Sequence, residues 1–212
     1  VEITQAGLRQ VQVHPKIGWT FAAAMRSFMR ADPDVIMVGE MRDEETAKIG
    51  IEASLTGHLV FSTLHTNSAV ESVVRLLDLG MDPFNFADAL LGVLSQRLVR
   101  TNCPSCLVVH VPTDEEVAAL RVSREKLGSV VFRSGAGCLQ CRQTGYSGRD
   151  GIYEIMTLSD KIRLLVAQGT SSVDIRKTAR EEGMRFLRES AVERVLEGTT
   201  TLREINKVTF VE

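Results

Sequence analysis

Several features that define common protein classes are missing from this sequence of 212 residues. Its apolar runs are short, as in Val35 to Val38, whereas a helix that spans a bilayer needs about 20 apolar residues. The first residues, Val1 to Thr4, lack the basic and apolar zones of a signal peptide, and they lack an initiator methionine. We therefore expect a cytoplasmic segment of a longer protein, without a membrane span.

The chain also lacks an excess of either charge. It contains 25 basic and 27 acidic residues, and its formal net charge is −2. Because a nucleic-acid partner is attracted by a basic field, we expect no such partner here. With 44% hydrophobic and 25% charged residues, the composition is that of an ordinary globular protein, and the chain is long enough to bury a core without cross-links.

A third absence concerns phosphate binding. No glycine in the chain is followed by lysine, so the phosphate-loop pattern G-x-x-x-x-G-K-[ST] does not occur. The glycines at 135–137 and 145–151 flank cysteines and are typical of turns. A nucleotide site built from this chain alone would therefore lack the loop that holds the phosphates.

The first hundred residues alternate between strand and helix patterns. Strands are expected at 8–14, 35–38 and 59–64, the second of them apolar throughout, as in a central parallel strand. Helices are expected at 20–31, 44–56 and 69–79, and a further amphipathic helix is expected from Leu90, Leu91, Leu94 and Leu98. This alternation predicts an α/β layer fold with a parallel sheet.

The pattern changes after this region. Capping boxes are expected at 68–71 and 113–116, and residues 201–204 are expected to cap the last helix. The second box opens an insert with a short helix and a strand at 130–132. After Glu154 the chain is expected to be helical to its end. We therefore expect three parts, residues 1–101, 102–150 and 151–212, in the order α/β core, cysteine module and helical C-terminal subdomain.

All four cysteines occur in two Cys-x-x-Cys pairs, Cys103 with Cys106 and Cys138 with Cys141. Two such turns can present four thiolates to one ion, and a closed tetrahedral set of thiolates is typical of structural zinc. A pair of disulfides, a redox motif and metal-free turns are the alternatives. Disulfides are disfavoured in a reducing compartment, and neither pair follows the strand-to-helix pattern of a redox motif.

A buried strand pattern ends in an acidic residue, Glu40. In open α/β sheets, ligands bind beyond the carboxyl ends of the strands. A glutamate there can orient or deprotonate the water that attacks a terminal phosphate, or hold Mg²⁺ through water. Since many parallel strands end in a glycine and an acid, an ordinary loop residue remains the alternative.

The next strand pattern ends in a polar cluster, Ser62 to Asn67, which contains His65. If the two strands are neighbours, His65 and Glu40 share one sheet edge, where the histidine could contact a terminal phosphate oxygen. His58 precedes the same strand. For each histidine, the alternative is a hydrogen-bonded loop residue without a catalytic role.

Two segments, 32–43 (DPDVIMVGEMRD) and 56–67 (TGHLVFSTLHTN), closely resemble the secretion ATPase superfamily, the traffic ATPases of type II secretion and type IV pili. The resemblance extends over essentially the whole chain. It implies the C-terminal part of a RecA-like P-loop NTPase domain with a tetracysteine zinc-binding insert and a helical C-terminal subdomain. The N-terminal domain and the Walker A loop of the family are not in this sequence.

The resemblance also implies roles for individual residues. Glu40 matches the catalytic glutamate of the family's Walker B motif, and His58 and His65 match its His box. Glu2 matches the last acid of the Asp box. Three arginines match positions near the nucleotide or the subunit boundary, namely Arg26, Arg30 and Arg42. The four cysteines match the zinc module of the secretion and pilus-extension branches, which the retraction branch generally lacks.

From the resemblance we expect a motor of six identical subunits that uses Mg²⁺ and ATP and carries structural Zn²⁺. Its expected partners are an inner-membrane platform protein and an adaptor of the secretion or pilus machine, at the cytoplasmic side of the inner membrane. Two alternatives stay open: a catalytically inactive regulatory homologue, and a zinc-knuckle adaptor module. The isolated segment is expected to be inactive without a phosphate loop.

Overall fold

Two separate hydrophobic cores divide the chain. The computed structural model describes residues 1–122, 127–128 and 130–209, so parts of the expected insert and of the expected C-terminal helical region lie outside the described residues. One compact unit comprises residues 1–91 and 158–178, and the other comprises residues 92–157 and 179–212. Each unit is therefore formed by two separate segments of the chain, which alternate along the sequence.

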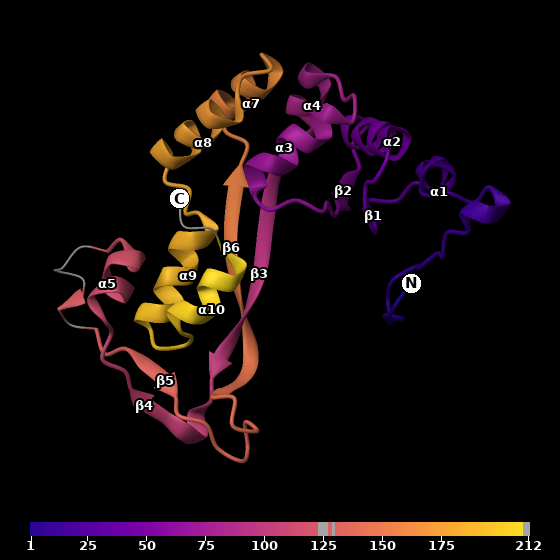
Figure 1. Cartoon of the computed structure of the whole chain (residues 1–212). Coiled ribbons are helices and arrows are strands. Elements are labelled where there is room, and N and C mark those ends of the chain that lie inside the picture. Colours follow the sequence, from indigo (N-terminus) through magenta and orange to yellow (C-terminus); the bar gives the residue numbers. More distant parts are fainter. Residues whose placement is uncertain (123–126, 129, 210–212) are drawn as a thin grey trace. The chain divides into compact units, whose positions relative to one another are not determined.

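The first unit contains most of the expected alternation of strands and helices (Figure 1). Its strands are β1 (Val35–Val38) and β2 (Leu59–Ser62). Its helices are α1 (Phe21–Phe28), α2 (Glu44–Leu55), α3 (Ala69–Asp78), α4 (Pro83–Ala89), α7 (Asp160–Ala167) and the first part of α8 (Ser172–Glu181).

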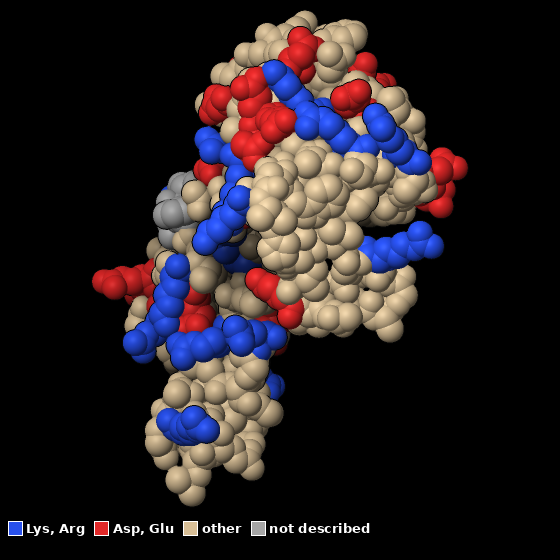
Figure 2. Space-filling view, turned by 90° about the vertical axis from the view of Figure 1, so that its right-hand side faces the viewer, with Lys and Arg blue, Asp and Glu red and all other residues tan. Residues whose placement is uncertain are grey.

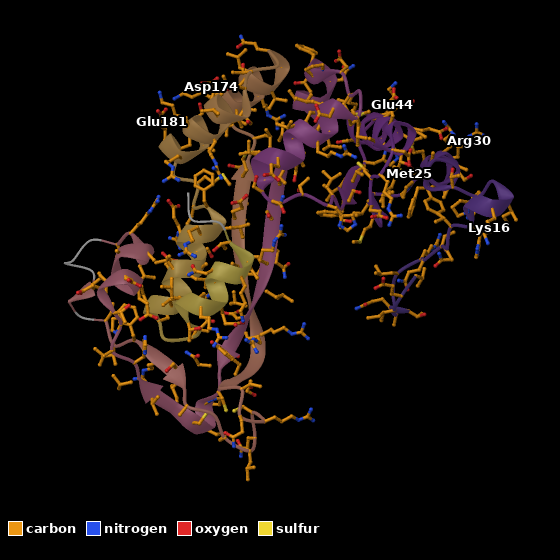
Figure 3. All side chains as sticks on the ribbon, in the orientation of Figure 1. Lys16, Met25, Arg30, Glu44, Asp174 and Glu181 are labelled. Carbon is orange, nitrogen blue, oxygen red and sulfur yellow. The ribbon has the colours of Figure 1, made fainter. Side chains whose placement is uncertain are left out.

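Strands β1 and β2 pair in parallel, with Val35 opposite Leu59 and Val38 opposite Ser62. The predicted parallel pairing is therefore confirmed. One face of the pair is covered, because Ile36 and Val38 are buried among apolar side chains of α1 and α2. Figure 3 labels Met25 of α1, which is almost completely buried in this core.

Local sequence explains where the helices of this unit begin. Asp43 precedes α2, and its carboxylate accepts hydrogen bonds from the backbone N–H of Thr46 (2.8 Å) and from the Thr46 hydroxyl (3.0 Å). Ser68 caps α3 through the backbone N–H of Glu71 at 3.2 Å. At the other end of α2, Gly57 has a φ of 103°, a left-handed conformation that glycine adopts without strain.

The second unit is built on a long antiparallel ribbon of β3 (Gly92–Asn102) and β6 (Tyr146–Thr157), with Val99 opposite Asp150. A shorter antiparallel pair consists of β4 (Leu107–Val109) and β5 (Arg133–Gly135). The helices of the unit are α5 (Asp114–Leu120), α9 (Leu187–Leu196) and α10 (Leu202–Val208). Figure 1 shows α9 and α10 alongside the ribbon, and buried residues of both helices share a core with Val99 and Ile152.

A partly buried ion pair connects α10 to the ribbon. The guanidinium of Arg100 on β3 donates to both carboxylate oxygens of Glu204 on α10, at 2.6 and 2.7 Å, and it also stacks over the ring of Tyr146 at 4.2 Å. The hydrogen bond from Arg100, opposed by burial and aided by Lys207, lowers the pKa of Glu204 to about 2. The C-terminal helix is therefore held by a charged, hydrogen-bonded contact as well as by apolar packing.

Three predicted elements are wrong. Residues 8–14 are mostly exposed and contain no strand, apart from an isolated bridge between His14 and Trp19. The helix expected from Leu90 to Leu98 is instead the start of β3, because these residues pair with β6, which is distant in sequence. The strand expected at 130–132 lies three residues later, as β5.

Within the part of the chain that the structure describes, every helix is too short or too polar to cross a membrane. The cap expected at 201–204 is confirmed, since the Thr201 hydroxyl accepts a hydrogen bond from the backbone N–H of Glu204. At 68–71, the Ser68 hydroxyl accepts the backbone hydrogen bond that a capping box requires. The box at Thr113 and Glu116 has both of its hydrogen bonds and is confirmed.

Candidate functional site

The carboxyl ends of β1 and β2 bring three of the predicted site residues together. Glu40 follows β1 directly, and its side chain is only 15% exposed. The Nε2 atom of His65, which follows β2, lies 3.0 Å from one carboxylate oxygen of Glu40. The Nε atom of Arg42 pairs with the other oxygen. The predicted proximity of His65 and Glu40 is therefore confirmed, while their catalytic roles stay a prediction.

The segment that carries Glu40 is short and anchored on both sides. Upstream, Gly39 ends the strand, and downstream Asp43 already caps α2. The segment that carries His65 is anchored by the start of α3, where the Thr66 hydroxyl lies 2.6 Å from the Ser72 hydroxyl and the Asn67 backbone N–H donates to Glu71 at 2.9 Å. Regular elements therefore fix the backbone on either side of this pair of groups.

The two groups differ in their access to solvent. The Glu40 carboxylate is mostly covered, whereas the His65 side chain is 86% exposed. A covered carboxylate can accept a proton from a water molecule at this edge of the sheet. An exposed imidazole can form a hydrogen bond with a phosphate oxygen of a bound ligand. The arrangement therefore offers a candidate general base with an exposed imidazole beside it.

The other predicted residues lie outside this contact. The Nδ1 atom of His58 lies 3.0 Å from the Ala53 carbonyl oxygen and 3.3 Å from the Thr56 hydroxyl, so this ring closes the end of α2. Arg26 pairs with Glu45 at 2.8 Å, and both side chains are exposed. Arg30 is exposed at the end of α1 (Figure 3), and Glu2 lies in the exposed N-terminal segment.

Sequence reasoning missed the part that Thr63 plays at this edge. Thr63 follows β2, and its hydroxyl donates a hydrogen bond to the Gly39 carbonyl at 2.5 Å. It belongs to the polar cluster 62–67 that the sequence singled out, but it received no role there. The signal was its position, because a threonine one residue past a paired strand can donate to a carbonyl just beyond the end of the neighbouring strand.

The second candidate site is formed by the four cysteines, which the fold brings together from two turns of the second unit. Their sulfur atoms all lie within 4.8 Å of one another. Three of the separations are 3.9, 3.9 and 3.7 Å, for the pairs 103–138, 106–141 and 138–141. Four sulfurs bonded to one zinc at about 2.3 Å lie about 3.8 Å apart, so the cluster fits a tetrahedral zinc site.

Backbone N–H groups point at two of the sulfurs. Gly137 donates to the Cys106 sulfur at 3.3 Å, while Cys138 and Gly145 donate to the Cys141 sulfur at 3.2 and 3.3 Å. Burial raises the pKa of the Cys106 thiol to about 12. Burial also acts to raise the pKa of Cys141, but the backbone donors and the hydrogen bonds with Cys138 and Cys106 together outweigh it, and the pKa falls to about 6. Zinc binds cysteines as thiolates, so a bound cation would favour the ionised form of its ligands.

Two glycines make this cluster possible. A Cβ atom on Gly135 would lie 1.9 Å from the Gly145 carbonyl oxygen, and one on Gly145 would lie 2.4 Å from the Gly135 carbonyl oxygen. The two backbones therefore touch where β5 passes the second cysteine turn. Gly145 has a φ of 76°, so its conformation also favours glycine.

The surroundings of the cysteines are basic. Neither residues 92–113 nor residues 133–149 contain an aspartate or a glutamate, although both contain arginines. Figure 2 shows basic side chains and no acidic ones on the visible face of the lower end, where β4, β5 and the cysteine turns lie. A zinc ion with four thiolates carries a net charge of −2, and this positive environment favours it.

Comparison with known proteins identifies relatives over nearly the whole chain. The family described as "Type II/IV secretion system protein" matches residues 1–207. The type IV pilus assembly ATPase PilB of Thermus thermophilus is 48% identical over 97% of this chain, which corresponds to 23% of that protein. The type II secretion system protein HxcR of Pseudomonas aeruginosa is also 48% identical, over 99% of this chain and 40% of that protein. The chain spans less than half the length of these relatives.

Solved structures share the fold. The pilus retraction motor PilT with bound ADP aligns with 90% of this chain and 43% of its own, with a TM-score of 0.62 and 26% sequence identity. The ATPase DotB of Legionella pneumophila gives a TM-score of 0.60 at 22% identity, which shows a similar fold only. The α/β fold predicted from the sequence is therefore confirmed as that of these ATPases.

Proposed function

The chain belongs to the type II/IV secretion system protein family, and from this premise we propose that it is the C-terminal ATPase segment of a motor. The motor hydrolyses ATP to drive assembly of a type II secretion pseudopilus or a type IV pilus. The observation that carries this proposal is the contact between Glu40 and His65 at the carboxyl ends of two parallel strands. The names of relatives such as PilB and HxcR agree with it.

In the proposed mechanism, Glu40 orients the attacking water and accepts its proton. His65 contacts the terminal phosphate of ATP, and Mg²⁺ neutralises the charge of the phosphates when it is bound. Arg42 pairs with the Glu40 carboxylate and can hold it in place until the nucleotide arrives. From the family resemblance alone, we propose that four further residues lie near the nucleotide or the subunit boundary, namely His58, Arg26, Arg30 and Glu2.

The phosphate loop is proposed to come from a part of the protein outside this sequence, since the pattern G-x-x-x-x-G-K-[ST] is absent here. The segment itself is accordingly proposed to be inactive. Its functional division into 1–101, 102–150 and 151–212 also stays a proposal. The motor is proposed to be a ring of six subunits in the cytoplasm that contacts an inner-membrane platform protein and an adaptor.

The four cysteines are proposed to hold one structural Zn²⁺ ion, because the sulfur separations suit tetrahedral coordination. A site closed by four thiolates leaves no open position for a reacting group, so its role is to stabilise the fold. The resemblance to export and extension motors, rather than to retraction motors, rests on the presence of this module.

The alternative function, an inactive regulatory homologue or adaptor, is tested by turnover. We expect Glu40→Gln in the complete protein to lower the ATPase rate by about 10²–10⁴-fold, because the water loses its positioned base. Glu52→Gln, an exposed glutamate on α2, serves as the matched control and should hydrolyse ATP like the wild type. A Glu40→Gln rate equal to that of the control would remove Glu40 from the mechanism.

A further inference from the structure

Thr63 makes two hydrogen bonds to the segment that carries Glu40. Its hydroxyl donates to the carbonyl oxygen of Gly39 at 2.5 Å, and its own carbonyl oxygen accepts from the backbone N–H of Met41 at 3.1 Å. The two anchored residues are the immediate neighbours of Glu40 in the chain. One residue, directly after the adjacent strand, therefore holds the backbone on both sides of the proposed base.

This contact continues the pairing of β1 with β2 past the last paired residues, Val38 and Ser62. Beyond that pair, Gly39 could flex freely, because glycine has no side chain to restrict its backbone. Here the Thr63 hydroxyl donates a hydrogen bond to the Gly39 carbonyl oxygen. The direction in which Glu40 leaves the strand is consequently set from β2 as well as from β1.

From this geometry we propose that Thr63 is a positioning residue for the proposed ATPase reaction, acting through Glu40. The proposal rests on the proposed function, since it assumes that Glu40 orients water. Thr63 itself contacts the Gly39 and Met41 backbone and is assigned no contact with the nucleotide. It therefore contributes to the rate of the chemical step and leaves nucleotide affinity almost unchanged.

A valine has nearly the shape of threonine but no hydroxyl, whereas a serine keeps the hydroxyl. Because a misplacement of about 1 Å can cost about 10²-fold in rate, we expect Thr63→Val in the complete protein to lower kcat by about 10- to 100-fold. The KM for ATP should change by less than about threefold, as for an interaction that acts in the transition state. Thr63→Ser should restore kcat to within about threefold of the wild type, because the hydroxyl returns.

Thr101→Val is the matched control. The Thr101 hydroxyl also donates to a backbone carbonyl of a neighbouring strand, that of Ser147, but this pair belongs to the other unit. This control should retain the wild-type kcat. Should Thr63→Val fail to fold, Thr63→Ala takes its place, and Thr63→Ser must still be active.

The double variant Glu40→Gln/Thr63→Val separates positioning from a general loss of structure. If Thr63 acts through Glu40, the second substitution should not lower the residual rate of Glu40→Gln further. A further loss in the double variant, a raised KM in Thr63→Val, or a kcat equal to that of Thr101→Val would each overturn the inference and leave the proposed function intact. Wild-type turnover by Glu40→Gln alone would remove both.

Discussion

At the scale of single residues, the proposed chemistry depends on one covered carboxylate and the groups around it. Glu40 is held between Arg42 and His65, and its neighbours Gly39 and Met41 are bonded to Thr63. The sequence predicts the meeting of Glu40 and His65, because adjacent parallel strands end at the same sheet edge. It does not predict that His58 turns to the end of α2, since that contact depends on the conformation of the turn at Gly57.

His65 can be tested by a change that removes its ring. We expect His65→Ala in the complete protein to lower kcat by about 10-fold or more with nearly unchanged ATP affinity, because a contact to the terminal phosphate counts mainly in the transition state. Steady-state kinetics and ATP-analogue binding measure the two effects. His14→Ala, an exposed histidine outside the site, is the control. If His65→Ala instead loses affinity for ATP and keeps its maximal rate, then His65 contacts ATP in the ground state and contributes nothing specific to the transition state.

At the scale of secondary structure, the central elements of the first unit follow from local patterns, whereas the long ribbon of the second unit does not. The apolar run 35–38 and the helix 44–55 are where the sequence places them, because burial and capping are local signals. The leucines at 94 and 98 fit a helical repeat but lie on the exposed face of β3, opposite the buried Ser95 and Val99. That strand is decided by its pairing with β6, which a local pattern does not contain.

The contact between α10 and β3 predicts that the free energy of unfolding decreases at low pH. The pKa of Glu204 is lowered to about 2 in the folded chain by its hydrogen bond with Arg100. The folded state therefore gains stability above the ordinary pKa of a glutamate, about 4.3, and this gain is lost as the pH falls from about 5 to 2. We expect up to about 3 kcal/mol of unfolding free energy to disappear over this range.

Urea unfolding at pH 7 and pH 3 measures this loss. Glu204→Gln cannot ionise, so its stability should depend less on pH in this range, and it should be less stable than the wild type at pH 7. Glu197→Gln, whose exposed carboxylate pairs with Arg194, is the control for a surface ion pair and should behave like the wild type. Equal pH profiles for the wild type and Glu204→Gln would contradict the assignment.

The contact of β5 with the second cysteine turn predicts a steric effect on the metal site. An added Cβ atom on Gly135 would overlap the Gly145 carbonyl, so one backbone must move in Gly135→Ala. We expect this variant to bind zinc more weakly in a competition assay with a chromogenic chelator. Ser134→Ala, on the same strand, adds no atom and should bind as the wild type does. Unchanged zinc affinity in Gly135→Ala would show that the two turns are not coupled.

At the scale of the whole chain, the two units should respond differently to loss of metal. We expect the purified chain to carry about one zinc ion per molecule, and binding of structural zinc can contribute about 10 kcal/mol or more to folding. Chelation or Cys138→Ser should therefore loosen the cysteine turns of residues 102–150 first. The first unit has its own core around Met25 and Ile36 and should persist.

Hydrogen exchange with and without chelator, together with metal analysis, measures this order. A folded sample that contains four free thiols and no zinc would end the proposal of a metal site. From the sequence, the two Cys-x-x-Cys pairs already predict the ligands, because their spacing suits a tetrathiolate site. The N–H donors of Gly137 and Gly145 are visible only in the folded chain, since they depend on how the two turns meet.

The central claim is that Glu40 is needed for hydrolysis but not for binding of ATP. The most direct measurement is the identity of the nucleotide that the complete protein retains after incubation with Mg²⁺ and ATP and rapid removal of free nucleotide. The account predicts that Glu40→Gln retains ATP, while the wild type and Glu52→Gln retain ADP. If Glu40→Gln retained ADP to the same extent as the wild type, or if no form of the protein retained a nucleotide, the account would be contradicted.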